Sequence, residues 1–346
     1  MMTLKQFEQS PQKIPNSAAW LLADLGEAKG KQELFARQSP QRLRSLREHA
    51  MIESTVSSNR IEGIQVERKR VGTIVFGRAA LRDRDEEEVR GYRDALKLIH
   101  SKGRGLPVSE KTILLLHRLS RGGLGDAGQL KIKDSDIIEK YPDGRVRVRF
   151  QTVKASQTPA FLKDLVKYWG FGLRQRWVHP LILLAGFNLD FLCIHPFRDG
   201  NGRVSRLLLL LQCYHLGYEV GRYMSIERTI EQNKQDYYES LEESSRGWHS
   251  GKHNPWPYVN YLLFVLKEAY REFEQRAGSA GIQRGAKTEI IVSAINRITG
   301  PFSVADILTA CPGVSVDLVR RTLKNLRSQR SVKCLRLGRD AQWQKT

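Results

Sequence analysis

The sequence predicts a mainly helical protein with one β-hairpin near its middle and a small separate unit at its C-terminus. Apolar residues recur at helical spacing through most of the chain, which is typical of amphipathic and buried helices. One short stretch, 145–150, instead alternates arginine with apolar residues, as a strand does. A small, Gly-rich and polar segment at 276–287 predicts a linker before the C-terminal unit, 288–346.

The composition limits the class of protein and its partners. The chain has 346 residues, enough for two or three domains, and a formal net charge of +20. This charge favours nucleotides, nucleic acid or acidic proteins as partners, although it also serves solubility alone. The four cysteines include no Cys-x-x-Cys pair, so a reducing compartment fits best. With no signal-peptide pattern and no spanning apolar run, we expect a cytoplasmic protein without a membrane partner.

The helical pattern can be followed along the chain. It predicts helices over residues 18–28, 43–60, 85–101, 109–121, 159–174, 179–194, 203–217 and 255–275. Between two of these, Asp143-Gly144 is a hairpin-turn signal, and Val146, Val148 and Phe150 then alternate with arginines to give a strand. Taken on its own, this ribbon is a small structural element with a solvated basic face.

Most of the chemistry lies in residues 195–206, His-Pro-Phe-Arg-Asp-Gly-Asn-Gly-Arg-Val-Ser-Arg. Apolar helical runs flank this stretch, so it predicts a loop that opens into a buried helix. Gly200 and Gly202 allow backbone N–H groups to approach an anion closely, and a helix N-terminus adds partial positive charge. The stretch therefore predicts a cradle for nucleotide phosphates.

The side chains of this stretch complement such a cradle. Arg203 and Arg206 can bind phosphate oxygens through their guanidinium groups. Asp199 is a hard oxygen ligand suited to Mg²⁺, and His195 is suited to act as a general base near neutral pH. Each residue alone is common in turns and cores, whereas their combination points specifically to a phosphate-binding site with a base beside it.

The same twelve residues match the signature of the Fic (Fido) family, His-Pro-Phe-x-Asp/Glu-Gly-Asn-Gly-Arg-x-x-Arg, at every defined position. The resemblance covers about residues 45–275. It implies an N-terminal helical region (1–100), an all-α catalytic core (101–275) and a β-hairpin flap. It also implies an activity, the transfer of AMP from ATP to a Ser, Thr or Tyr hydroxyl of a protein, which can be the enzyme itself. A homodimer is a further expectation.

The resemblance also implies roles for individual residues. His195 would take the proton of the target hydroxyl, and Asp199 would hold Mg²⁺ against the α- and β-phosphates. Phe197 would lie in the core. The expected nucleotide-binding residues are Gly200, Asn201, Gly202, Arg203, Arg206 and Tyr238. Tyr238 belongs to a Tyr-Tyr pair that would lie near the purine, although core packing explains Tyr237 equally well and Tyr238 somewhat less well.

A second motif lies upstream of the first. Ser58-x-x-x-Glu62-Gly63 on its own reads as a solvated helix end with a glycine C-cap. It also resembles the inhibitory helix motif of Fic proteins, so Glu62 is expected to compete with the γ-phosphate for Arg206.

The predicted hairpin resembles the flap on which Fic proteins dock a target segment as an added strand, through Val146, Val148 and Phe150. The chain departs from the family in two places here. The prolines common after the flap are absent, and Lys131 stands where the family commonly has Arg in Gly-x-x-Arg.

The C-terminal unit reads as three helices followed by a hairpin, the pattern of a winged helix-turn-helix. Its third helix carries a basic face formed by Arg320, Arg321, Lys324 and Arg327. That face predicts contact with the major groove of DNA, and a protein-interaction domain is the equal alternative.

Two further functions stay open at this stage. One is a DNA-binding regulator whose Fic core only senses ATP, although His195 argues against it because phosphate binding needs no base. The other is a Fic enzyme that transfers a different phosphate-containing group or removes AMP. Phosphorylating relatives usually lack the second glycine and the final arginine, and this chain has both, as Gly202 and Arg206.

Overall fold

The computed structural model describes the chain except residues 1, 39, 78–79, 141–142, 279–285, 299, 312–313, 337, 339–340 and 346. Most of the predicted linker, 276–287, therefore lies outside the described residues, and its first three residues end a helix instead. In the described part the chain is mainly helical with two small sheets, as expected. None of the described helices is long and apolar enough to cross a membrane.

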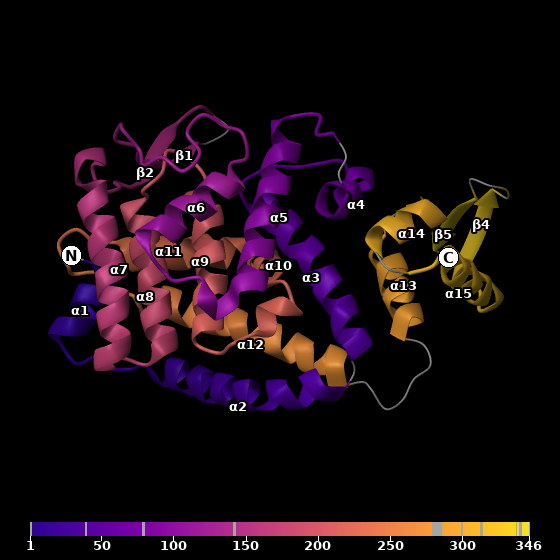
Figure 1. The fold of residues 1–346 in the computed structure, drawn as a ribbon, viewed down its shortest axis with the longest axis horizontal. Helices are drawn as coiled ribbons and strands as arrows, with labels where there is room; N and C mark the ends of the chain where they lie inside the picture. Colours follow the sequence, from indigo (N-terminus) through magenta and orange to yellow (C-terminus); the bar gives the residue numbers. More distant parts are fainter. Residues whose placement is uncertain are drawn as a thin grey trace.

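Twelve α-helices are described in the larger, N-terminal part of the chain (Figure 1). They are α1 (Thr3–Gln9), α2 (Asn16–Gln38), α3 (Pro40–Ile61), α4 (Arg68–Phe76), α5 (Arg84–Lys102), α6 (Glu110–Ser120), α7 (Thr158–Gln175), α8 (Pro180–Ile194), α9 (Asn201–His215), α10 (Ile226–Gln232), α11 (Lys234–Ser245) and α12 (Trp256–Gly278). Three short 3₁₀ turns join them at Gly103–Gly105, Ala155–Gln157 and Val220–Arg222.

The helix expected at 18–28 was predicted too short, because α2 runs from Asn16 to Gln38. Its pattern is weakly amphipathic, but it lies along α12 over much of its length, and this packing extends the helix beyond the local signal (Figure 1). The short polar helix α1 was not predicted. The buried carboxylate of Asp190 accepts hydrogen bonds from the backbone N–H groups of Thr3 (2.7 Å) and Leu4 (2.9 Å) and so holds its first turn.

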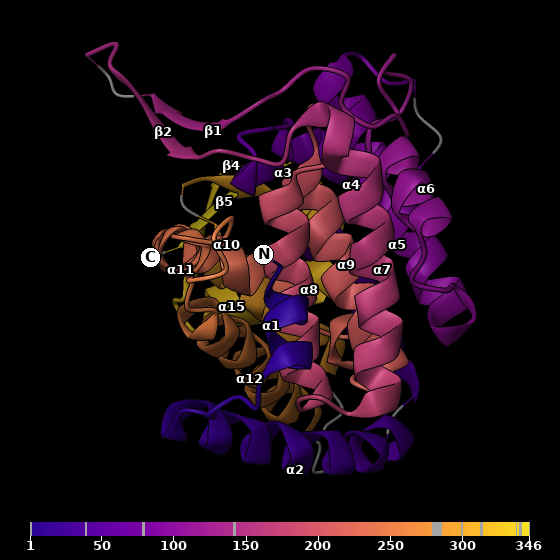
Figure 2. The same cartoon turned by 90° about the vertical axis from the view of Figure 1, so that its left-hand side faces the viewer.

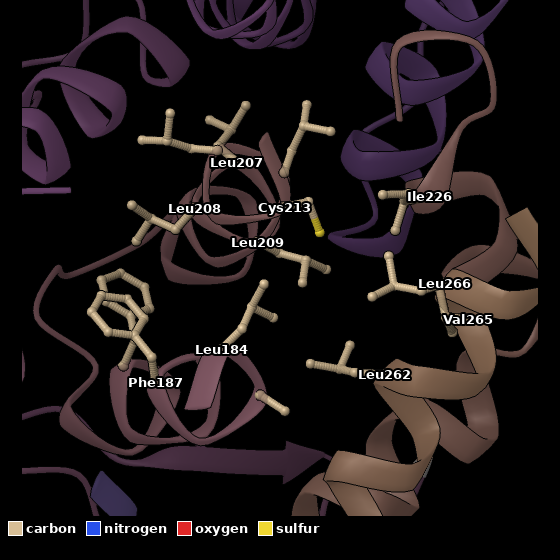
Figure 3. Close-up of a cluster of buried hydrophobic side chains, with 14 of the residues drawn as sticks. Leu184, Phe187, Leu207, Leu208, Leu209, Cys213, Ile226, Leu262, Val265 and Leu266 are labelled. Atoms are coloured by element: carbon tan, nitrogen blue, oxygen red, sulfur yellow. The ribbon is translucent and has the colours of Figure 1, made fainter. Parts of the chain in front are cut away.

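The core is built around α8 and α9, which the loop 195–200 connects. Every residue of α8 from Leu181 to Ile194 is buried, as its apolar sequence requires. Leu184 and Phe187 of α8 lie below the leucines of α9, and side chains of α12 complete the cluster (Figure 3). The loop between the two helices therefore starts and ends on rigid, buried elements.

The predicted hairpin is confirmed (Figure 2). Strand β1 (Ile137–Lys140) pairs antiparallel with β2 (Val146–Phe150), and Gly144 has a φ of +83° in the turn. The hairpin lies at one end of the helical body, where Arg147 and Arg149 of β2 form ion pairs with Glu242 of α11.

The C-terminal unit has its own apolar core. It contains α13 (Ala286–Arg297), α14 (Val304–Ala310) and α15 (Val316–Ser328), and the strands β3 (Phe302–Ser303), β4 (Val332–Arg336) and β5 (Gln342–Lys345). The strands form one sheet in the order β3-β5-β4, so β3 adds a strand to the predicted hairpin. Ser303 starts α14 with a capping box. Helix α14 packs against α4 of the larger part (Figure 1).

Candidate active site

His195 lies where α8 ends and is its left-handed C-cap, with a φ of +51°. Its Nδ1 faces the carbonyl oxygen of Leu192 at 3.3 Å, so the proton of the neutral ring belongs on Nδ1 and Nε2 keeps a free lone pair. Burial, assisted by the Lys131 cation, lowers the pKa of His195 to about 4. The imidazole is therefore neutral at pH 7 and able to accept a proton.

The loop after His195 is held by packing and hydrogen bonds. Phe197 is buried, as predicted, and stacks on His117 with ring centroids 3.7 Å apart. His117 accepts the N–H of Gly128 at Nδ1 (2.9 Å), so its Nε2–H donates to the Asp199 carbonyl (3.1 Å). Both residues fix the direction in which the Asp199 backbone turns.

Asn201 was expected to contact phosphate directly, but its side chain has another role in the structure. Its Oδ1 accepts the Phe197 N–H (2.9 Å) and its Nδ2 donates to the Phe197 carbonyl (2.8 Å). The amide thus closes the loop, and both of its polar atoms are engaged there.

Gly200 and Gly202 occupy the positions that need glycine. Gly200 has a φ of +81° and is the N-cap of α9. A Cβ atom added to Gly202 would lie 2.1 Å from Oε1 of Glu62, so the glycine permits this carboxylate to sit on the first turn of α9. That turn has unsatisfied N–H groups and partial positive charge, which favour an anion.

Arg206 connects the two sequence motifs. Its Nε donates to Ser58 Oγ (2.8 Å), and its Nη2 donates to the Ser58 carbonyl (2.9 Å) and to Glu62 Oε1 (2.7 Å). The guanidinium is buried, and its Nη1 has no hydrogen-bond partner among the described residues. The predicted approach of Glu62 to Arg206 is therefore present in the fold, and Ser58 adds two hydrogen bonds to the same guanidinium.

Arg203 lies away from the position predicted for it. Only 1% of its side chain is exposed, and it forms an ion pair with Glu88, which is equally buried. Its Nη1 also donates to the Ser120 carbonyl (3.4 Å). Arg203 therefore supports the start of α9 from inside the core and is not placed to reach outer phosphates.

Asp199 is half exposed at the mouth of the site. Its Oδ1 accepts the Gly200 N–H (2.6 Å), and Oδ2 accepts Arg121 Nη1 (2.8 Å) and Arg84 Nη2 (3.3 Å). Burial alone would raise the pKa of Asp199, but Arg121 and Arg203 outweigh it and keep the pKa below its ordinary value. The carboxylate is ionised and accessible, as a cation ligand must be.

A metal ion at this site would need ligands from the substrate as well as from Asp199. Among the described residues no cluster of three or more His, Cys, Asp or Glu side chains could hold a metal ion. One carboxylate combined with phosphate oxygens is, however, a usual arrangement for Mg²⁺. Asp199 fits that arrangement.

A cavity of about 380 Å³ opens beside His195 and Gly202. Glu62 lies on one wall, Tyr238 and other residues of α11 on a second, and the flap on a third. Phe150 lines the cavity, whereas Val146 and Val148 are 57% and 50% exposed outside it. Of the predicted flap residues, Phe150 thus belongs to the cavity and the two valines to the outer surface.

The four predicted DNA-contacting residues, Arg320, Arg321, Lys324 and Arg327, are exposed on α15 and take no part in this site. Other residues of the site were missed by sequence reasoning. They are Glu88, His117 and Arg121, and Lys131, which the sequence marked only as a departure from the family pattern. The first three reach the loop from α5 and α6, and no motif links them to residues 195–206.

The comparisons with known proteins agree with this geometry. Residues 107–213 match the Fic/DOC family. The protein adenylyltransferase Fic of Nematostella vectensis is 27% identical over 205 residues, which cover 55% of this chain and 42% of that protein. The chain therefore spans less than half the length of this curated relative.

Solved structures share the fold. A Fic family protein from Desulfovibrio desulfuricans G20 gives a TM-score of 0.63 at 23% identity, with 98% of both chains covered. A Fic domain-containing signaling protein from Bacteroides thetaiotaomicron gives 0.62 at 22% identity, with 76% of this chain and 99% of that chain covered. Fic-1 (residues 134–508) from C. elegans gives 0.57 at 20% identity, covering 75% and 71%. The chain therefore has the fold of these Fic proteins, and residues 107–213 are the part that matches the Fic/DOC family.

Proposed function

We propose that this protein is an adenylyltransferase that moves AMP from ATP to a hydroxyl group of a protein. The main support is the position of His195, which lines a cavity together with Gly202 at the start of α9, a helix N-terminus suited to an anion. The similarity to a protein adenylyltransferase supports the same reaction, with ATP and a protein hydroxyl as the proposed substrates.

The chain's own groups account for the steps. His195 Nε2 accepts the proton of the hydroxyl while the hydroxyl oxygen attacks the α-phosphorus, and pyrophosphate leaves. The N–H groups at the start of α9 bind phosphate oxygens, and Arg206 neutralises the outer phosphate. Asp199 would hold Mg²⁺, which supplies further charge neutralisation when bound. Arg203 and Asn201 keep the cradle rigid from behind.

The enzyme is autoinhibited in this proposal. Glu62 occupies the first turn of α9 and binds Arg206, which are the two groups that the phosphates of ATP need. Arg206 Nη2 is bound by Glu62 Oε1, and a γ-phosphate that approached this guanidinium would meet the negative charge of Glu62, so the two anions compete for Arg206. ATP bound in the presence of Glu62 would then be misaligned for in-line attack.

A second role concerns the C-terminal unit, which we propose to be a winged helix that binds duplex DNA. The supporting observation is α15, whose buried face packs on the core of the unit while Arg320, Arg321, Lys324 and Arg327 face solvent. Such an exposed basic helix suits the major groove and the phosphates that border it. This role is compatible with catalysis by the Fic domain.

The reaction is tested with two labelled forms of ATP in the presence of Mg²⁺. Label on the α-phosphate should enter protein, label on the γ-phosphate should not, and mass spectrometry should find one added AMP. His195→Ala should abolish transfer but leave ATP affinity within a few-fold, because the base acts on the incoming hydroxyl. Transfer of the γ-label, or near wild-type transfer by His195→Ala, would contradict the proposal.

A further inference from the structure

We infer that Lys131 is a positioning residue that holds His195 in its left-handed conformation and joins it to the base of the flap. This inference rests on the proposed role of His195 as the base. The backbone N–H of Lys131 donates to the Pro196 carbonyl (2.9 Å), and its Nζ donates to the Ile194 carbonyl (3.2 Å). One residue thus binds the carbonyl groups immediately before and after His195.

These two contacts act on an unfavourable backbone conformation. Only three non-glycine residues in the described part of the chain have positive φ, and His195, at +51°, is one of them. An L-residue disfavours this region, so the surrounding contacts must determine it. Lys131 holds the carbonyl groups of both residues that flank His195 and thereby limits the direction in which the imidazole points.

The third contact of Lys131 reaches the flap. Its Nζ donates to Thr152 Oγ1 (2.7 Å), and the Thr152 hydroxyl donates to the Ser135 carbonyl (2.6 Å). Ser135 and Thr152 lie two residues outside the paired strands, at the base of the hairpin. Lys131 and Thr152 are 5% and 8% exposed, so these bonds are shielded from water. The flap and His195 are therefore set relative to each other by one ammonium group.

The positive charge of Lys131 also supports the proposed role of His195 as a base. Burial lowers its pKa to about 8, with Asp134 and Asp136 opposing this shift, so the side chain is mainly charged at pH 7. The cation favours the neutral form of His195, which is the form that accepts a proton. Glu62 and Asp199 face the same imidazole and favour its protonated form. Lys131 thus opposes the effect of these two carboxylates on the pKa of His195.

Three variants of the full chain separate the contributions. Lys131→Met removes the charge and the Nζ donor, Lys131→Arg keeps a cation and donors, and Thr152→Val removes only the hydroxyl that anchors Nζ. In a Glu62→Gly background, Lys131→Met should lower kcat by about 100-fold, the cost of misplacing a catalytic group by about 1 Å, with little change in KM for ATP. Lys131→Arg should recover most of the lost kcat, and Thr152→Val should give an intermediate loss.

An NMR titration of His195 gives a readout that does not depend on transfer. Lys131→Met should raise the pKa of His195, and Lys131→Arg should leave it near its original value. An unchanged kcat and an unchanged His195 pKa in Lys131→Met would overturn the inference, as would a lower melting temperature without either change. If Lys131→Met does not fold, the kcat of Thr152→Val tests the inference: an intermediate loss would support it, and an unchanged kcat would overturn it. Failure of the proposed reaction is separate, because it appears as transfer that survives His195→Ala.

Discussion

Helices α9 and α15 both carry closely spaced basic residues, and both were predicted to bind phosphate groups, yet the fold treats them differently. On α9, Arg203 and Arg206 are 1% and 2% exposed and are engaged by the carboxylates Glu88 and Glu62. On α15 the basic side chains are exposed on the face opposite the buried Val319 and Leu323. The same residue types therefore face two different environments.

The difference shows that partners and burial decide how a basic helix can act. A buried guanidinium acts on one anion within a confined site, so its effect is local and screened little by salt. An exposed basic face acts through many weak contacts with a polyanion, and its binding depends strongly on salt. Variants on the two helices separate these two modes of binding.

The largest effect is expected from removing one buried arginine. Arg206→Ala should lower AMP transfer by about 100- to 1,000-fold, the cost of one group that stabilises transition-state charge. It should not imitate the loss of Glu62, because it also removes a phosphate ligand. Arg327→Ala, a matched change on α15, should leave transfer unchanged. Assays with labelled ATP measure transfer by both variants. Equal losses of transfer in both would contradict the distinction between the two helices.

A smaller effect is expected in DNA binding. The full chain should bind duplex DNA through α15, and each phosphate contact removed by Arg320→Ala, Arg321→Ala, Lys324→Ala or Arg327→Ala should flatten the log–log salt slope by about one unit. Fluorescence anisotropy over a series of salt concentrations measures the slope. Full-length protein with no affinity for DNA at low salt would instead assign the C-terminal unit to protein interactions.

The smallest effect is expected from pH. Because the pKa of His195 is lowered to about 4, the imidazole stays neutral as pH falls through its ordinary value of 6.5. Protonation should therefore reduce kcat only as the pH approaches 4, and kcat should show no inflection near 6.5 from this residue. A pH–rate profile of the Glu62→Gly variant measures this. An acid limb centred near 6.5 would show that His195 is more solvated than the fold places it.

The sequence allowed much of the site to be predicted because the main motif is continuous. Residues 195–206 lie in one loop and one helical turn, so their proximity follows from the chain itself. The pairing of Glu62 with Arg206 spans 144 residues and was predictable only through the resemblance to Fic proteins. The hairpin was recognised from its alternating residues and its Asp-Gly turn.

Other features depend on tertiary contacts that leave no local pattern. Glu88 and His117 meet the loop 195–200 and the start of α9 only after α5 and α6 pack beside α9. The amide of Asn201 was assigned to phosphate because its bonds to Phe197 depend on how the loop folds back. The full length of α2 likewise follows from packing on α12, which a weak helical pattern does not indicate.

The central claim is that Glu62 restrains the enzyme by holding Arg206 at the start of α9. Its most direct test compares AMP incorporation from α-labelled ATP by the wild-type protein and by Glu62→Gly. Glu67→Gly serves as the control, because it removes another carboxylate that is 71% exposed and pairs with Arg82 instead. Glu62→Gly should raise incorporation by at least about 10-fold, the scale of one regulatory coupling, and the control should not. Equal incorporation by the wild-type protein and Glu62→Gly would contradict the account and leave Glu62 as an ordinary residue beyond a helix end.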